Sequence, residues 1–228
     1  MTENITAPLL VVNQLNKVVQ SPDGSLTLLD DVNFDISSGE SVAIVGASGA
    51  GKSTLLALLA GLDVPSSGNV TIDDNVLFSL DEDGRAQLRG KLIGFVFQSF
   101  QLLPSLTAIE NVMLPLELLN IDEPESKAKK VMERVGLSQR LKHYPRQLSG
   151  GEQQRVAIAR AFVVEPKILL ADEPTGNLDV RTGETIIELL FALNQELKTT
   201  LILVTHDQKL AARCQRQLEM DAGRISEC

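Results

Sequence analysis

The segment that most constrains this chain is Gly46 to Ser53, with the sequence GASGAGKS. It directly follows the apolar run SVAIV and directly precedes the helix-forming run TLLALLA, which matches the pattern GxxxxGK[ST] between a strand and a helix. Glycines let main-chain amides converge on phosphate oxygens, and the helix directs its positive N-terminal dipole at them. An ordinary glycine-rich turn is the weaker alternative. The predicted phosphate site comprises Gly46, Ala47, Ser48, Gly49, Ala50, Gly51, Lys52, Ser53 and Thr54.

Short apolar runs alternate with longer helix-like stretches along most of the chain. Because parallel strands buried between helices produce such runs, the pattern predicts an α/β fold with a P-loop core. The runs are Leu9 to Val12, Ser41 to Val45, Ile93 to Phe97, Ile168 to Ala171 and Leu201 to Val204. Stretches punctuated by Gly and Asp, Asn69 to Leu77 and Gln217 to Ile225, are predicted as antiparallel, hairpin-like strands at the edge of that sheet.

The strand pattern disappears between about Thr107 and Leu148. Ala108 to Leu119 and Ser126 to Val135 are predicted helices, and prolines punctuate the stretch. We therefore expect a single domain over 1–228, in which 1–98 and 149–228 form the α/β core. Residues 99–148 form an inserted helical subdomain, with a further helix starting at its end.

Composition excludes several classes of function. A formal net charge of -9 gives no general attraction for nucleic acid, so no nucleic-acid partner is expected. Two cysteines, Cys214 and Cys228, are too few for a disulfide framework and are expected to be plain thiols in a reducing compartment. The N-terminus MTENITAPLLVV does not resemble a signal peptide, and no apolar run approaches the length needed to span a bilayer. We expect a cytoplasmic protein whose partner crosses the membrane.

Polar residues follow two of the predicted core strands, at the strand ends that face the ligand crevice in such sheets. Asp172 and Glu173 end the run KILLADE; Asp172 is predicted to reach Mg²⁺ and Glu173 to polarise the attacking water. His206 follows LILVT and is assigned to the γ-phosphate, although a lone histidine at a strand end is more often structural. His143 is interpreted as a surface or packing residue.

A second anion-binding segment is LSGGEQQR, Leu148 to Arg155. Ser149 is predicted to cap a helix whose first amides, with Gly150 and Gly151, form a nest for an anion. An N-cap with two glycines is a fair alternative, but it leaves a second exposed anion site unexplained. A second copy of the chain, turned head to tail, would use this segment to close the first phosphate site.

At these residues the sequence resembles the nucleotide-binding domains of ABC transporters over essentially its whole length. GASGAGKS then corresponds to the Walker A loop, LSGGEQQR to the signature and ILLADE to the Walker B strand. The segments GFVFQSFQLLPSLTAIENV and ADEPTGNLD resemble the LolD and MacB group of ATPases, and within it the YbbA type. The resemblance implies catalytic roles for Glu173, His206, Lys52 and Gln98, Mg²⁺ contacts from Ser53, Gln98 and Asp172, a D-loop at Asp179, and signature contacts in trans from Ser149, Gly150, Gly151 and Glu152.

The same resemblance implies an ATPase that requires ATP and Mg²⁺ and forms a homodimer around two ATP molecules. Its other partner would be an integral membrane permease of the MacB, LolC/LolE or YbbP type, which places the chain on the cytoplasmic face of the inner membrane. The group implies extraction or export of a lipid-like or hydrophobic substrate by transmission of motion. Coupling elements of the permease would contact the surface near Gln98, Phe100, Leu102 and Leu103.

One feature departs from the family pattern. Most members stack the adenine on an aromatic side chain after the first strand, but Leu15 to Asn33 contains none. Val19 lies near the expected position and could offer only a partial apolar contact.

The sequence argues against two alternatives to a transport ATPase. A soluble ABC ATPase acting on DNA, ribosomes or chromosomes would carry paired cassettes or a long coiled coil, whereas this chain has one compact cassette and an acidic balance. A P-loop kinase of small molecules would lack LSGGEQQR.

Overall fold

The computed structural model describes residues 7–21 and 24–228. The expectation of an N-terminus without a signal peptide falls partly on residues 1–6, outside the described residues. The strands are β1 (Leu10–Ser21), β2 (Gly24–Ile36), β3 (Ser41–Val45), β4 (Ser67–Ile72), β5 (Asn75–Val76), β6 (Ile93–Val96), β7 (Ile168–Asp172), β8 (Thr200–Val204), β9 (Arg216–Asp221) and β10 (Arg224–Glu227). The helices are α1 (Lys52–Leu59), α2 (Glu82–Leu92), α3 (Ala108–Leu118), α4 (Pro124–Arg134), α5 (Gly150–Phe162), α6 (Val180–Leu197) and α7 (Gln208–Ala211), with 3₁₀ turns at Leu77–Ser79 and Pro145–Gln147.

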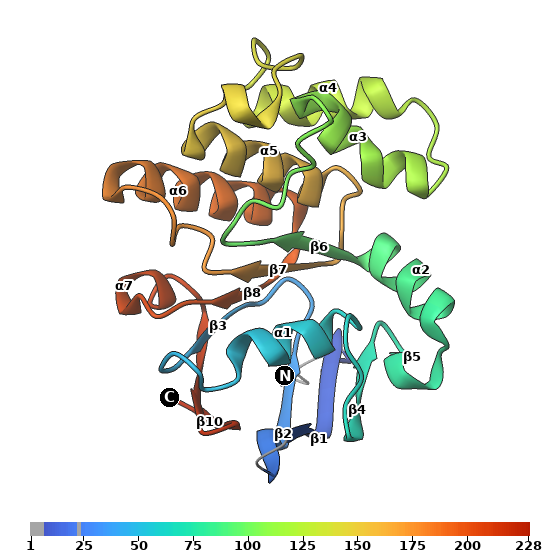
Figure 1. Ribbon diagram of the computed structural model, residues 1–228, viewed down its shortest axis with the longest axis vertical. Helices are drawn as coiled ribbons and strands as arrows, with labels where there is room; N and C mark the ends of the chain where they lie inside the picture. Colours follow the sequence, from blue (N-terminus) through green and yellow to red (C-terminus); the bar gives the residue numbers. More distant parts are fainter. Residues whose placement is uncertain (1–6, 22–23) are drawn as a thin grey trace, which may run out of the picture. The chain divides into compact units, whose positions relative to one another are not determined.

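The chain divides into two compact units (Figure 1). The first contains the described residues of Met1–Arg89 together with Thr200–Cys228, and the second is Gly90–Thr199. The predicted helical subdomain, 99–148, lies wholly within the second unit. None of the helices in the described ranges is both long enough and apolar enough to span a membrane.

The first unit contains two kinds of sheet structure. β2, β1, β4 and β5 form an antiparallel sheet in that order, while β3 pairs in parallel with both β8 and β9. Every residue of β3 and β8 is buried, as expected of parallel strands covered on both faces. β10 pairs antiparallel with β9 and forms the edge.

In the second unit, β6 and β7 pair in parallel, and the helices surround α5. α5 contacts α3, α4, α6 and β6 (Figure 1), which explains why most of its apolar residues are buried. A buried side chain also holds the loop that enters α3. Asn111 is fully buried and donates hydrogen bonds to the carbonyl oxygens of Leu103, Leu106 and Thr107.

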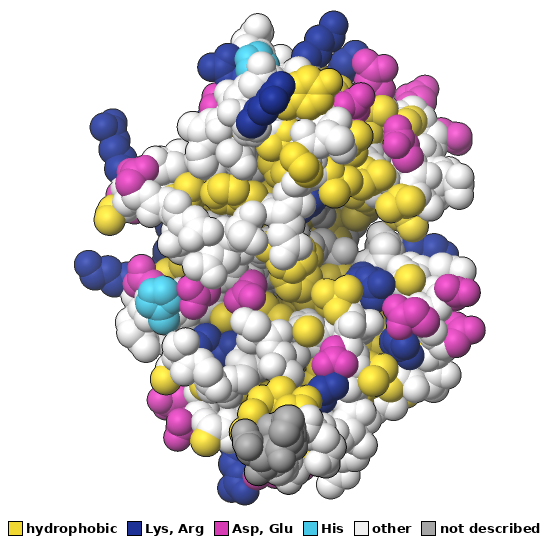
Figure 2. Space-filling view, viewed as in Figure 1, with side chains coloured by type: hydrophobic (Ala, Val, Ile, Leu, Met, Phe, Trp, Pro, Cys, Tyr) yellow, Lys and Arg dark blue, Asp and Glu magenta, His cyan; other side chains and the backbone are white. Residues whose placement is uncertain are grey.

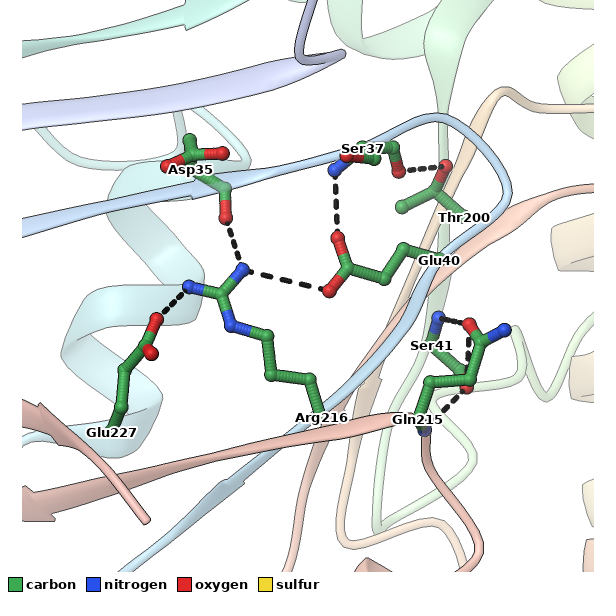
Figure 3. Close-up of polar contacts among 8 residues, drawn as sticks. All are labelled: Asp35, Ser37, Glu40, Ser41, Thr200, Gln215, Arg216 and Glu227. Carbon is green, nitrogen blue, oxygen red and sulfur yellow. Dashed lines mark hydrogen bonds and ion pairs between the residues drawn. The ribbon is translucent and has the colours of Figure 1, made fainter. Parts of the chain in front are cut away.

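Polar contacts fasten the edge of the first unit (Figure 3). Arg216 donates to the carbonyl oxygen of Asp35 at 2.8 Å and forms ion pairs with Glu40 and Glu227. Nearby, Gln215 accepts a hydrogen bond from the amide of Ser41 at 2.8 Å. These contacts join the start of β9 to the end of β2, the start of β3 and β10. They hold the β9–β10 hairpin, on which the glycine loop before α1 rests.

Charged side chains of both signs are scattered over the face shown in Figure 2, with hydrophobic side chains between them. On that face the acidic excess is not concentrated in a single-signed patch.

Two sequence predictions about strands were wrong in part. The hairpin predicted over Asn69 to Leu77 is present as β4 and β5, but it belongs to the antiparallel sheet with β1, because β4 pairs with β1. The run Leu9 to Val12 is not a buried parallel strand. It is the start of the long antiparallel strand β1, which pairs with β2 and β4. The hairpin at Gln217 to Ile225 lies at the sheet edge as predicted.

Candidate nucleotide-binding and hydrolysis site

The glycine loop Gly46 to Gly51 leads into α1, and this helix starts without a side-chain cap. Its N-cap residue, Gly51, has left-handed backbone angles. The first amides of a helix have no partner within the helix, so a helix start without a side-chain cap is suited to an anionic ligand. The loop rests on the end of β9: a Cβ at Gly46 would lie 2.2 Å from the carbonyl oxygen of Met220. No residue with a side chain fits there.

Lys52 places its ammonium group over the same loop. Its Nζ donates to the carbonyl oxygens of Gly46 at 2.7 Å and of Ala47 at 2.8 Å, and the residue is only 7% exposed. Since these contacts restrain the side chain, a positive charge is already held beside the amides that would receive phosphate. A phosphate oxygen needs to displace only carbonyl contacts to bind this cation.

The acidic pair at the end of β7 is set on an unusual backbone. Asp172 ends the strand, and Glu173 follows with φ 43°, in the left-handed region that few residues with side chains adopt. The carbonyl oxygen of Glu173 accepts from the amide of Gly176 at 3.0 Å, which closes the turn. Both acidic side chains are half-buried. Backbone strain of this kind persists where the surrounding structure enforces it, as at functional sites.

Gln98, which follows β6, lies beside the turn after β7. Its carbonyl oxygen accepts from the side chain of Asn177 at 3.0 Å. A Cβ at Gly176 would lie 2.5 Å from Nε2 of Gln98, so the glutamine side chain packs directly against this glycine and would have to shift if a side chain were added there. The structure thus brings together Gln98, which is predicted to contribute to catalysis and to Mg²⁺ binding, and the turn that contains Glu173, within one unit.

The predicted signature forms the start of α5. Ser149 caps the helix: its Oγ accepts from the amide of Glu152 at 3.3 Å, and the Glu152 carboxylate accepts from the amide of Ser149 at 2.8 Å. Ser149 is exposed, whereas Gly150 and Gly151 are half-buried. A Cβ at Gly150 would lie 3.2 Å from Leu178, so this helix start contacts the segment before α6. The predicted helix cap at Ser149 is confirmed, and anion binding at this helix start stays a prediction.

Asp179 of the predicted D-loop caps α6 by accepting from the amide of Thr182 at 3.1 Å. Hydrogen bonds from the side chain and amide of Thr182 lower the pKa of Asp179. The aspartate is therefore ionised at neutral pH, and it fixes the direction in which the helix leaves the Asn177 turn.

The remaining predicted residues lie in the first unit. His206 is exposed and follows β8, directly before Asp207, which caps α7. Val19 lies on β1 opposite Leu26 of β2 and is half-buried. The first unit thus contains Val19, residues 46–54 and His206, and the second contains Gln98, Asp172, Glu173, residues 149–152 and Asp179.

Sequence reasoning missed two arginines that support these segments. Arg160 of α5 donates to the carbonyl oxygens of Phe100 at 3.0 Å and Gln101 at 2.7 Å, and Arg140 pairs with Glu152 at 2.8 Å. Neither has a sequence signature, because each partner lies 12 or more positions away. The run VAIARAF after the signature did contain Arg160, but a single arginine on a helix is ordinarily a surface residue.

A pocket of about 440 Å³ opens elsewhere in the first unit, among β1, β2, β9 and β10. Phe34, Leu218 and Arg216 are among its lining residues, but none of the predicted site residues is. Its lining offers no glycine loop and no helix start, so we do not assign the nucleotide to it.

Mg²⁺ fits the donor chemistry of the predicted ligands. Within the described part of the chain, no three His, Cys, Asp or Glu side chains cluster so as to hold a metal ion by themselves. Mg²⁺ in nucleotide sites is held by one or two protein oxygens together with phosphates and waters. The hydroxyl of Ser53 and the carboxylate of Asp172 are oxygen donors of that kind.

The fold and these motifs define an ATP-binding cassette, and the chain belongs to the ABC transporter family, whose model matches residues 29–176. Its enzymatic activity is ATP hydrolysis, with ATP and Mg²⁺ as the cofactors. Among its relatives is the uncharacterised ABC transporter ATP-binding protein YbbA of Escherichia coli strain K12, 54% identical over 95% of this chain and 96% of that protein. The lipoprotein-releasing system ATP-binding protein LolD of Bordetella pertussis strain Tohama I is 49% identical over 99% of each chain.

Solved structures of ATP-binding cassettes have the same fold as this chain. A dimeric, post-hydrolysis state of the ATP-binding cassette MJ0796, bound to ADP and Pi, superposes with a TM-score of 0.88 at 40% identity, covering 96% of this chain and 98% of that one. CbiO1 from Clostridium perfringens, part of the transporter complex cbiONQ, superposes with a TM-score of 0.83 at 33% identity, covering 96% and 87%. The predicted fold and family are confirmed.

Proposed function

We propose that two copies of this chain close around two ATP molecules, each held between the glycine loop of one copy and the signature of the other. The observation that carries this proposal is the exposed, capped start of α5 at Ser149. One chain offers two helix starts suited to an anion, one at Lys52 and one at Ser149. The MJ0796 cassette, which is dimeric and bound to ADP and Pi, supports a dimer that holds nucleotide.

In this proposal each predicted site residue has a separate role in ATP binding or hydrolysis. The loop amides and Lys52 bind the β and γ phosphates. Ser53, Gln98 and Asp172 would hold Mg²⁺, which would offset the negative charge that develops on the phosphates. Glu173 accepts a proton from the attacking water, and His206 contacts the γ-phosphate. Asp179 fixes the entry to α6 at the face between the copies.

The dimer can be tested by size-exclusion chromatography with light scattering, with and without Mg²⁺-free ATP. Glu173→Gln should remove the base but keep ATP binding, so ATP should shift this variant to a dimer by mass action. Lys52→Ala removes a charge-assisted phosphate contact and should stay monomeric. A Glu173→Gln chain that remains monomeric at saturating ATP would overturn the proposal.

We further propose that the dimer drives a membrane permease of the MacB, LolC/LolE or YbbP type, on the cytoplasmic face of the inner membrane, to extract or export a lipid-like substrate. Support comes from the similarity to LolD and from an apolar segment that follows Gln98. Leu103 is 43% exposed and Phe100 and Leu102 are half-buried. Apolar residues that lie together and remain partly exposed are typical of an interface.

Copurification with the permease tests whether it binds at Leu102 and Leu103. Leu102→Glu with Leu103→Glu should prevent isolation of a complex with the permease, because each charge would have to be buried in the interface without a partner. The matched control is Leu118→Glu, since Leu118 is 74% exposed on α3. If the complex survives the double substitution, the permease docks elsewhere.

A further inference from the structure

The acidic residue in the signature creates an electrostatic problem for the proposed dimer. Glu152 accepts from the hydroxyl of Ser149 at 3.0 Å and from its amide at 2.8 Å. Hydrogen bonds from Arg140 and from the amide of Ser149 lower the pKa of Glu152 to about 2, so the side chain carries a full negative charge at neutral pH. A polyphosphate arriving at Ser149 would be repelled by that charge.

Arg140 is placed to compensate it. Its Nε donates to Oε1 of Glu152 at 2.8 Å, while Oε2 receives both hydrogen bonds from Ser149. The two carboxylate oxygens of Glu152 therefore have different roles: Oε2 accepts the hydrogen bonds of the helix cap, and Oε1 accepts the hydrogen bond from Arg140. The Glu152 side chain is 18% exposed and that of Arg140 is 45% exposed, so the pair lies at the surface beside the cap.

A second capping box in the same unit shows that a cap does not need the cation. At the start of α3, Glu110 accepts from the amide and the hydroxyl of Thr107 through one oxygen, Oε2, in the same geometry. Among the described residues, the hydrogen bonds to the Glu110 side chain come from Thr107 and involve no arginine. The arginine is therefore an addition at the signature helix and not a requirement of capping.

We propose that Arg140 is a positioning residue that supplies the counter-charge to Glu152, so that the signature start can accept the γ-phosphate of an ATP bound to the other copy. The inference rests on the proposed dimer. Arg140 acts through Glu152. Its positive charge offsets the Glu152 carboxylate and weakens the hydrogen bond that the Ser149 hydroxyl donates to that carboxylate. The hydroxyl can then rotate and donate to the phosphate instead.

A charge role and a purely structural role predict different results when both residues are changed. If Arg140 only stabilised the turn that contains it, its loss would harm the dimer whether or not Glu152 were charged. If it offsets the carboxylate, removing the carboxylate as well should restore the dimer. Coupling of this kind is what a double-mutant cycle measures.

The test uses the full chain with Glu173→Gln as parent and measures the Mg²⁺-free ATP concentration at which half the protein is dimeric. Adding Arg140→Ala should raise that concentration about tenfold, as expected for an uncompensated like charge close to the phosphate. Adding Glu152→Gln to this variant should return it to within about twofold of the parent, and Arg140→Lys should stay close to the parent because it keeps the charge.

The matched control is Arg134→Ala. Arg134 forms a surface ion pair with Glu196 in the same unit, so its loss changes the net charge equally away from the cap. This control should leave the half-dimer concentration within about twofold of the parent. An Arg140→Ala defect no larger than that of Arg134→Ala, or one that persists with Glu152→Gln, would overturn the inference alone. A parent that does not dimerise in ATP would overturn the proposed function and this inference with it.

Discussion

The guanidinium group of Arg160 lies 2.7 Å from the carbonyl oxygen of Gln101 and also donates to the carbonyl oxygen of Phe100. Phe100 and Gln101 have φ values of 59° and 48°, so two consecutive residues with side chains adopt left-handed backbone angles. Such conformations cost about 1–3 kcal/mol each and persist only where neighbouring contacts enforce them. Arg160 thereby ties the signature helix α5 to the segment that follows Gln98.

Replacing Arg160 with Met should lower the free energy of unfolding by about 3 kcal/mol, because two carbonyl groups lose charge-assisted hydrogen bonds. Urea unfolding of the purified chain measures the change. Arg134→Met, which removes an arginine from a surface ion pair, should cost less than about 1 kcal/mol. Equal losses in the two variants would show that the Arg160 contacts contribute no more than a surface pair.

Glu173→Gln should reduce the steady-state rate of ATP hydrolysis by about 10²- to 10⁴-fold, the effect of losing a general base. The matched control is Glu165→Gln, because Glu165 is exposed in the same unit and also has a left-handed backbone, with φ 50°. A phosphate-release assay should show nearly wild-type turnover for the control. Wild-type turnover by Glu173→Gln would remove Glu173 from the catalytic assignment.

We expect the chain to discriminate weakly between ATP and GTP, because Val19, the residue predicted to contact the nucleobase, is aliphatic and cannot stack as an aromatic ring would. Competition binding should give similar affinities for the two nucleotides. Val19→Tyr should tighten ATP binding about two- to tenfold through stacking. Val18→Tyr is the control, since adjacent side chains of β1 point to opposite faces. A strong ATP preference in the unmodified chain would contradict the prediction.

The pH dependence of stability should contain a contribution from Glu152. Arg140 and the amide of Ser149 hold the pKa of this carboxyl at about 2, below its ordinary 4.5. A carboxyl whose pKa is lowered by folding contributes stability above its unfolded pKa, and this contribution is lost as pH falls from about 4.5 through about 2. Urea unfolding of wild type and Glu152→Gln should therefore differ more at about pH 6 than at about pH 2.5. A difference that is independent of pH would contradict this assignment.

Sequence patterns predicted the core strands well where burial is complete. Ser41 to Val45 is β3 with the predicted bounds, since all five residues are apolar or buried on both faces. The pattern failed for β2, whose aspartates Asp30, Asp31 and Asp35 obscure the alternation, and for α2, which has no buried residue and hence no apolar face to detect. β2 is determined by its pairing with β1, and that pairing cannot be detected in the local sequence of β2.

The sequence by itself predicted the phosphate site, because the proposed site uses consecutive amides and a lysine within one loop. It also predicted the helix cap, which needs only Ser149 and Glu152, three positions apart. Tertiary structure alone decided what supports those groups. Gln98 meets Gly176, Arg160 reaches Gln101, and Arg140 reaches Glu152. Such contacts join segments that are far apart along the chain, so they leave no repeating pattern in the sequence. They form only when packing brings the segments together.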